Sequence, residues 1–86
     1  PNPASEKAYL NYRLPEPMRY VDFRIFNTSG KLVRHKPYCP ANRGKHHIEL
    51  RFDNISGDQT LFYQLDFKST KGITRRVRAK LIHLDQ

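Results

Sequence analysis

The sequence has no tryptophan, a single cysteine and no long hydrophobic run. One cysteine, Cys39, excludes an internal disulfide framework and any zinc module built from several cysteines. No apolar stretch approaches the roughly 20 residues that a membrane-spanning helix needs. No signal peptide is recognisable, and the chain begins with Pro1 rather than Met, so we expect a segment of a longer protein.

The chain has few acidic residues. Sixteen basic residues stand against eight acidic ones, which gives a formal net charge of +8 over 86 residues. A chain of this length predicts one small domain, residues 1–86. Three roles are consistent with this positive charge. They are binding of single-stranded nucleic acid, docking onto an acidic protein or an anionic glycolipid surface, and solubility alone. Against nucleic acid, the chain shows no Gly-rich or RNP-like RNA-binding signature.

Apolar residues alternate with polar ones along most of the chain, as half-buried strands require. The stretches with this period of two are 8–14, 20–27, 31–36, 47–53, 61–68 and 73–84. Turn signals separate them, with Gly30, Gly57 and Gly72 at the expected bends. The longest loop is predicted at 34–45, where two prolines and a glycine break the alternation.

Short strands separated by frequent turns predict an all-β antiparallel sandwich. The last strand carries the basic residues Arg75, Arg76 and Arg78, which suit either an edge protected by charge or a docking face. Val33, Tyr63 and Leu81 are predicted to belong to the core.

Catalytic and metal sites find little support in the sequence. The carboxylates are scattered over turns and outward strand positions, which predicts exposed, solubilising charge rather than a general acid and base. His35, Cys39, His46 and His47 lie within thirteen residues of one another, but neighbouring strand residues face opposite ways, so His46 and His47 would not share an ion. We therefore expect a non-enzymatic domain without metal or other cofactor.

Several short motifs occur in order along the whole chain. They are Pro1-Asn2-Pro3-Ala4, Leu14-Pro15-Glu16, residues 21–27 with the turn 29–33, Gly44-x-His46-x-Ile48-x-Leu50, Leu61-Phe62-Tyr63, and Lys80-Leu81-Ile82. Their order and spacing resemble the C-terminal sorting domain of type IX secretion cargo in Bacteroidetes, and the related Ig-like domain of flagellar hook-capping proteins. The resemblance implies an Ig-like sandwich of about seven strands.

It also implies a non-catalytic signal recognised by the outer-membrane translocon or its shuttle. The cargo would pass through the periplasm, reach the outer-membrane surface or the medium, and be joined by a sortase to anionic lipopolysaccharide. The residues that match the family's motifs, and are expected to contact the translocon, are Gly30, Lys31, Val33, Lys80, Leu81 and Ile82. An exposed last strand can add to the edge of a partner's sheet. A basic β-domain that binds single-stranded nucleic acid and a structural Ig-like module remain the alternatives, and edge-strand dimerisation remains open.

Overall fold

The computed structural model describes residues 7–52 and 59–83, and in this part of the chain the regular elements are all antiparallel strands. The strands are β1 (Lys7–Leu14), β2 (Met18–Asn27), β3 (Leu32–Lys36), β4 (Gly44–Arg51), β5 (Gln59–Ser69) and β6 (Thr74–His83). Each stretch of alternating residues therefore forms a strand, with bounds that differ from the prediction by a few residues. Over the same described ranges, no helix is long and apolar enough to cross a membrane.

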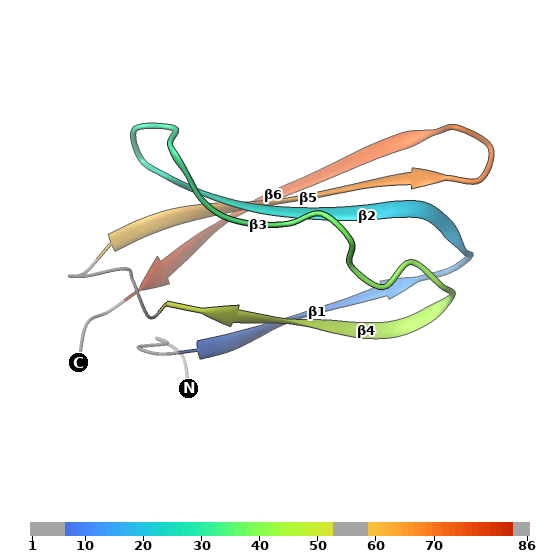
Figure 1. Ribbon diagram of the computed structural model, residues 1–86, viewed down its shortest axis with the longest axis horizontal. Coiled ribbons are helices and arrows are strands. Elements are labelled where there is room, and N and C mark those ends of the chain that lie inside the picture. The colour runs from blue at the N-terminus through green and yellow to red at the C-terminus, as the bar shows by residue number, and fades with distance from the viewer. Residues whose placement is uncertain (1–6, 53–58, 84–86) are drawn as a thin grey trace.

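The strands form two layers, which Figure 1 shows one above the other. One sheet has two strands, β1 and β4, and the other has four, in the order β3-β2-β5-β6. The predicted sandwich is confirmed, with six strands in the described residues where about seven were expected. The predicted edge position of the last strand is also confirmed, because β6 ends the four-stranded sheet.

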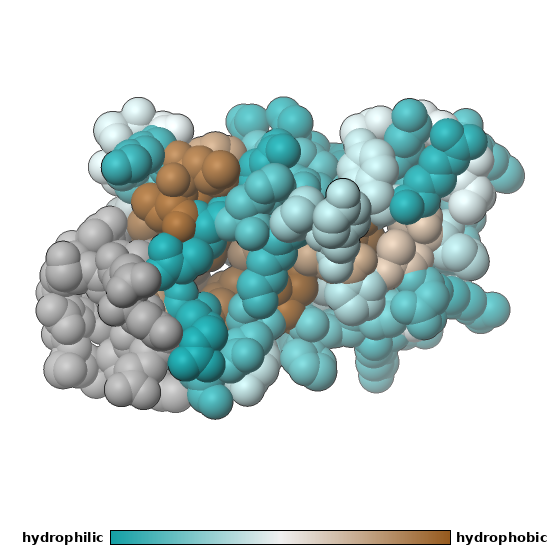
Figure 2. Space-filling model, viewed as in Figure 1, coloured by the Kyte–Doolittle hydropathy of each residue, from teal (hydrophilic) through white to brown (hydrophobic). Residues whose placement is uncertain are grey.

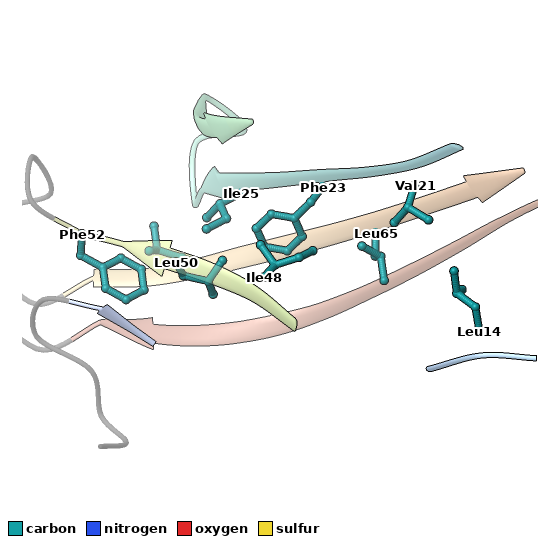
Figure 3. Packing of buried hydrophobic residues seen from close by; sticks show 9 residues of the cluster. Leu14, Val21, Phe23, Ile25, Ile48, Leu50, Phe52 and Leu65 are labelled. Carbon is teal, nitrogen blue, oxygen red and sulfur yellow. The ribbon is translucent and has the colours of Figure 1, made fainter. Parts of the chain in front are cut away.

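The core lies between the two layers and follows the alternation in the sequence (Figure 3). Val21, Phe23 and Ile25 of β2 are at most 1% exposed, and they face Ile48 and Leu50 of β4 across the interior. Burying one such side chain contributes about 2 kcal/mol to folding. The remaining buried apolar residues are Leu14, Phe52, Leu61 and Leu65. Val33, Tyr63 and Leu81 are half-buried against this cluster, at its margin rather than within it.

Two hairpin turns have the same hydrogen bond and the same glycine conformation. In the β2–β3 turn the N–H of Gly30 donates to the carbonyl of Asn27, and in the β5–β6 turn the N–H of Gly72 donates to the carbonyl of Ser69, both at 3.0 Å. Both glycines have φ of 87°, a left-handed conformation that costs glycine little. Both turns were predicted from the glycine positions. They lie at opposite ends of the sheet (Figure 1).

The predicted loop at 34–45 is wrong at both ends, because residues 34–36 belong to β3 and residues 44–45 to β4. The loop 37–43 packs back onto β2: the N–H of Met18 donates to Ala41 at 2.8 Å, and the N–H of Cys39 donates to Val21 at 3.1 Å. These main-chain hydrogen bonds extend the pairing along β2 beyond the end of β3. The prolines of this loop gave no reason to expect them. The predicted turn at Gly57 lies outside the described residues.

Candidate functional site

The strand register brings the two predicted contact segments to one end of the four-stranded sheet. Asn27, at the end of β2, lies opposite Leu61 of β5, and Leu61 lies opposite Leu81 of β6. The β2–β3 turn and the last residues of β6 are therefore neighbours across the sheet, although about fifty residues separate them in the sequence. Adjacent strands are about 4.8 Å apart, so the four strands span about 14 Å at this end.

An apolar row crosses the outer face of the sheet at this end. Leu32 of β3 lies opposite Phe26 of β2, Phe26 opposite Phe62 of β5, and Phe62 opposite Lys80 of β6. Leu32 is 44% exposed and Phe62 is 41% exposed, which is unusual for a face that otherwise carries polar side chains. Figure 2 shows hydrophobic atoms at the surface near the β2–β3 turn. We call Leu32, Phe26, Phe62 and Lys80 the outer row.

Gly30, Lys31 and Val33 border the outer row from the β2–β3 turn. The side chain of Asn27 holds this turn, because its Oδ1 accepts hydrogen bonds from the main-chain N–H of Ser29 (3.0 Å) and of Lys31 (2.9 Å). Gly30 and Lys31 are exposed, whereas Val33 packs against the core. The turn therefore presents one rigid backbone surface, with the Lys31 side chain in solvent.

Lys80 ends the outer row at the opposite edge of the sheet, and Leu81 and Ile82 follow it in β6. Among the described strands β6 pairs with β5 alone, so one side of its backbone is open. Lys80 is exposed on the outer face, and Leu81 is half-buried toward the core. An open strand edge offers a row of main-chain donors and acceptors to a pairing partner.

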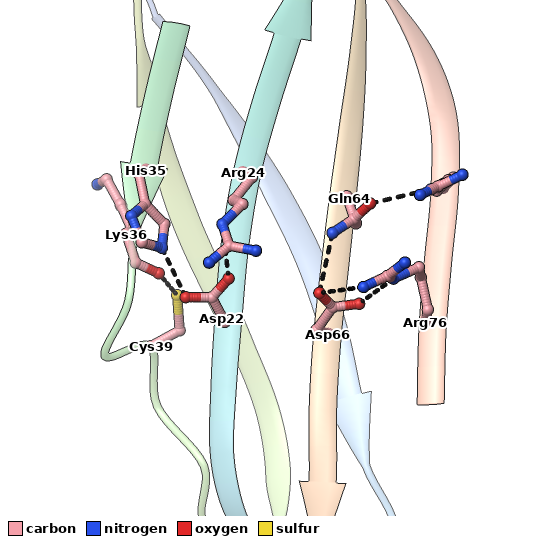
Figure 4. Close-up of polar contacts among 9 residues, drawn as sticks. Asp22, Arg24, His35, Lys36, Cys39, Gln64, Asp66 and Arg76 are labelled. Carbon is pink, nitrogen blue, oxygen red and sulfur yellow. Dashed lines mark hydrogen bonds and ion pairs between the residues drawn. The ribbon is translucent and has the colours of Figure 1, made fainter. Parts of the chain in front are cut away.

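Polar side chains fill the rest of the outer face in a connected network (Figure 4). Arg76 Nε donates to Asp66 Oδ1 at 2.7 Å, Gln64 donates to Asp66 Oδ2 at 2.9 Å, and Arg78 Nε donates to Gln64 at 2.9 Å. Burial alone would raise the pKa of Asp66, but these hydrogen bonds and the charges of Arg76 and Arg24 hold it below its usual value. Asp66 in turn raises the pKa of Arg76.

A second carboxylate lies beside this network. Asp22 faces Asp66 across β2 and β5, and it contacts Arg24 at 3.3 Å and His35 Nε2 at 2.6 Å. The prediction that the acidic residues are exposed surface charge is wrong for Asp66, which is 7% exposed, because arginine and glutamine supply the hydrogen bonds that make its burial possible.

The three arginines that the sequence grouped together do not share a face. Arg76 and Arg78 lie opposite Asp66 and Gln64 on the outer face, whereas Arg75 lies opposite Phe67, on the face that looks toward β1. Strand alternation places Arg75 there. The role predicted for the three residues stays a prediction, but a single docking face would hold two of them.

Cys39 and the histidines lie apart from the outer row. The Cys39 thiol donates to the carbonyl of Lys36 at 3.3 Å, and burial raises its pKa, so it stays protonated. His46 packs beside Tyr12 and His47 beside Tyr9, on opposite faces of the β1–β4 sheet as predicted. Over residues 7–52 and 59–83, no three histidine, cysteine or acidic side chains are placed to hold a metal ion.

A weak signal for the outer row is present in the sequence. Phe62 occupies an outward position in a strand whose inward positions are already apolar, and Phe26 does the same in β2. Two aromatic side chains on the polar face of adjacent strands, Phe62 exposed and Phe26 half-buried, mark a surface that can bind a partner. That they share a row with Lys80 depends on register, which alternation does not encode.

The chain matches a known protein family. A family model described as the secretion system C-terminal sorting domain matches residues 1–77. This match includes the turn with Gly30, Lys31 and Val33 and ends within β6, before Lys80. No curated protein and no solved structure shows a significant match to the chain.

Proposed function

This chain belongs to the family of secretion system C-terminal sorting domains, the signals of type IX secretion, and on that premise we propose that it directs export by being bound at the outer row. Sorting domains of this family interact with the secretion machinery and accompany cargo to the cell surface or beyond. The family suggests a non-catalytic role. The proposal adds the place of contact, the passage through the periplasm and the identity of the receptor as the outer-membrane translocon or its shuttle.

One observation carries the proposal. The outer row joins the β2–β3 turn, within the family match, to the open edge of β6. A partner strand added to the open edge of β6 would lie next to Lys80, with β6 between it and Phe62. Main-chain pairing would then act at the edge, and apolar side chains of the partner that reach over the outer face of β6 would contact Phe62. Leu32 and Phe62 expose apolar surface that folding does not use, and burial at an interface would remove it from water.

The polar network gives this surface its selectivity. Arg76 and Arg78 are already hydrogen-bonded to Asp66 and Gln64, so their guanidinium groups are held in place on the sheet. A partner contacting the outer row would meet positive charge at a fixed position on its flank. Such charges set orientation and association rate more than affinity.

Attachment of the cargo to anionic lipopolysaccharide after sortase cleavage is part of the same proposal. It rests on the family and on no feature of the outer row. In this proposal the domain makes the contact with the translocon or its shuttle before cleavage, and the sortase carries out the joining reaction.

A reporter fusion tests the proposal. A fluorescent protein targeted to the periplasm is fused ahead of residues 1–86 and expressed in a type IX-competent bacterium and in its translocon-deficient twin. We expect reporter at the surface or in the medium of the competent strain only. The variant Lys80→Glu lowers export, while Lys45→Glu, an exposed lysine on the other sheet, leaves it unchanged.

Retention of the reporter in the periplasm of both strains would contradict the proposal. In that case binding of the purified chain to single-stranded oligonucleotides, measured against salt concentration, distinguishes the two alternatives. Steep salt dependence would favour a nucleic-acid-binding domain, and absence of binding would favour a structural module.

A further inference from the structure

The two layers of the sandwich are unequal, and a groove opens where the smaller one ends. The β1–β4 sheet covers only part of the four-stranded sheet. A cavity of about 650 Å³ lies between β1, β5 and β6. This volume is within the range of ligand pockets, about 300–1,000 Å³.

The residues around the groove show how it is oriented. On the β1 side it contacts every residue from 10 to 16, whereas on β6 it contacts Ile73 on the approach to the strand and then the alternate residues Arg75 and Val77. Successive residues of a strand point to opposite faces. A surface lined by consecutive residues is therefore a strand edge, and one lined by alternate residues is a strand face. The groove runs along the edge of β1 and over the inner face of β6.

The edge of β1 is available for main-chain pairing. Of the strands described, β1 pairs with β4 alone. In an antiparallel ladder about half of the main-chain N–H and C=O groups of a strand point away from its partner. Along residues 10–14 those outward groups border the groove, so one further strand could extend the β1–β4 sheet over β6.

The floor of the groove is apolar and exposed. Ile73 is 57% exposed and Val77 is 45% exposed, although Val77 faces the interior of the sandwich. Half-buried Tyr63 and Phe67 continue this floor on β5. A third strand beside β1 would cover these side chains and complete the layer.

The rim of the groove is basic. Arg13 from β1, Lys71 from the β5–β6 turn and Arg75 from β6 line it, with Glu16 the one carboxylate among its lining residues. All three cations are exposed, and none of them forms an ion pair with the part of the chain that the structure describes. An occupant carrying carboxylates would satisfy them.

We propose that this groove receives an extended segment of a partner protein in which apolar residues alternate with acidic ones. The segment adds a strand to the edge of β1, places its apolar side chains on Ile73 and Val77, and carries its carboxylates on its other face, beside Arg13 of β1. The long, exposed side chains of Lys71 and Arg75 extend past the segment to reach these carboxylates. This surface is separate from the outer row, because Arg75 and Lys80 point to opposite faces of β6. The inference therefore goes beyond the export proposal.

A peptide titration of the isotope-labelled 86-residue chain tests it. The probe is a ten-residue peptide in which Val and Ile alternate with Glu and Thr. One control peptide has Lys in place of Glu, and another has two prolines that interrupt main-chain pairing. Nuclear magnetic resonance locates the amides that shift, and fluorescence anisotropy gives the affinity.

We expect shifts at residues 10–14 and 73–77, with binding at least about tenfold weaker for either control peptide. Arg75→Glu weakens binding of the acidic peptide about tenfold, whereas Arg78→Glu, on the same strand but the other face, leaves it unchanged. Thermal unfolding checks that both variants are folded.

Three results would overturn the inference. They are the absence of binding by any of the peptides, shifts confined to the outer face, and self-association of the chain that moves the same amides without peptide, which would make a second copy the occupant. Export is not measured in this experiment, so its failure leaves the export proposal untouched, and failure of export leaves this inference untouched.

Discussion

Asp22 on β2 lies directly opposite Asp66 on β5, on the same face of the sheet. Two like charges in such a pair destabilise a sheet by up to about 1 kcal/mol. Here Arg24 contacts Asp22 at 3.3 Å and Arg76 contacts Asp66 at 2.7 Å, so each carboxylate has an arginine of its own. The stability of the outer face therefore depends on pH.

Acid should destabilise the domain through Asp66. Its pKa in the folded state lies below the unfolded value of about 3.9. The stabilisation is therefore present above that unfolded value and is lost as the pH falls through the folded one. Urea unfolding should be followed between pH 6 and pH 2. As the pH is lowered, the urea concentration at the midpoint of unfolding should fall for the wild type and should fall less for Asp66→Asn. At pH 7 that variant should lose about 1–2 kcal/mol, because a buried acceptor of charged donors is weakened.

Arg76→Gln should weaken this pH dependence. It removes hydrogen bonds and a charge that lower the pKa of Asp66 and leaves its burial, which raises that pKa, so the folded pKa moves toward or above the unfolded value. The stability lost between pH 6 and pH 2 should therefore be smaller than in the wild type, or reversed in sign. Identical pH profiles for the wild type and both variants would contradict the role given to this ion pair.

The two equivalent turns offer a matched pair of substitutions. Gly30 and Gly72 both have φ of 87°, and a Cβ at either would meet open space, so only backbone strain opposes alanine. Gly30→Ala and Gly72→Ala should each lower the free energy of unfolding by about 1 kcal/mol. Only Gly30 adjoins the outer row. Equal losses of stability with a greater loss of export for Gly30→Ala would support a role for that turn beyond folding; equal losses of export would assign the effect to stability.

Tyr12 of β1 is joined to the loop 37–43 through its hydroxyl, which donates to the carbonyl of Pro40 at 2.7 Å. Tyr12→Phe removes this bond and should lower the free energy of unfolding by about 1 kcal/mol. Burial, helped by the nearby Cys39, raises the pKa of Tyr12 to about 12. Its stabilisation is thus complete below pH 10 and lost between about pH 10 and 12. Absorbance titration of the tyrosines should lose its highest-pH component in Tyr12→Phe.

The sequence predicted the strands well because each one must bury alternate side chains, and this requirement is local. Val21, Phe23 and Ile25 belong to the core as their spacing indicates. Register is not local: nothing in the alternation places Phe62 between Phe26 and Lys80. The burial of Asp66 was missed for the same reason, since it depends on an arginine ten residues away in the neighbouring strand.

Export of a Phe62→Ser reporter fusion tests the central claim most directly. Phe62 is 41% exposed, so the substitution should change the free energy of unfolding by less than about 1 kcal/mol. Tyr38→Ser is the matched control, because Tyr38 is 94% exposed and lies in the loop 37–43. If the outer row is the contact, Phe62→Ser lowers surface delivery at least about tenfold, since a central aromatic anchor of an interface contributes about 2 kcal/mol or more. Tyr38→Ser then exports normally. Normal export of a folded Phe62→Ser fusion, or an equal loss from both variants, would contradict it.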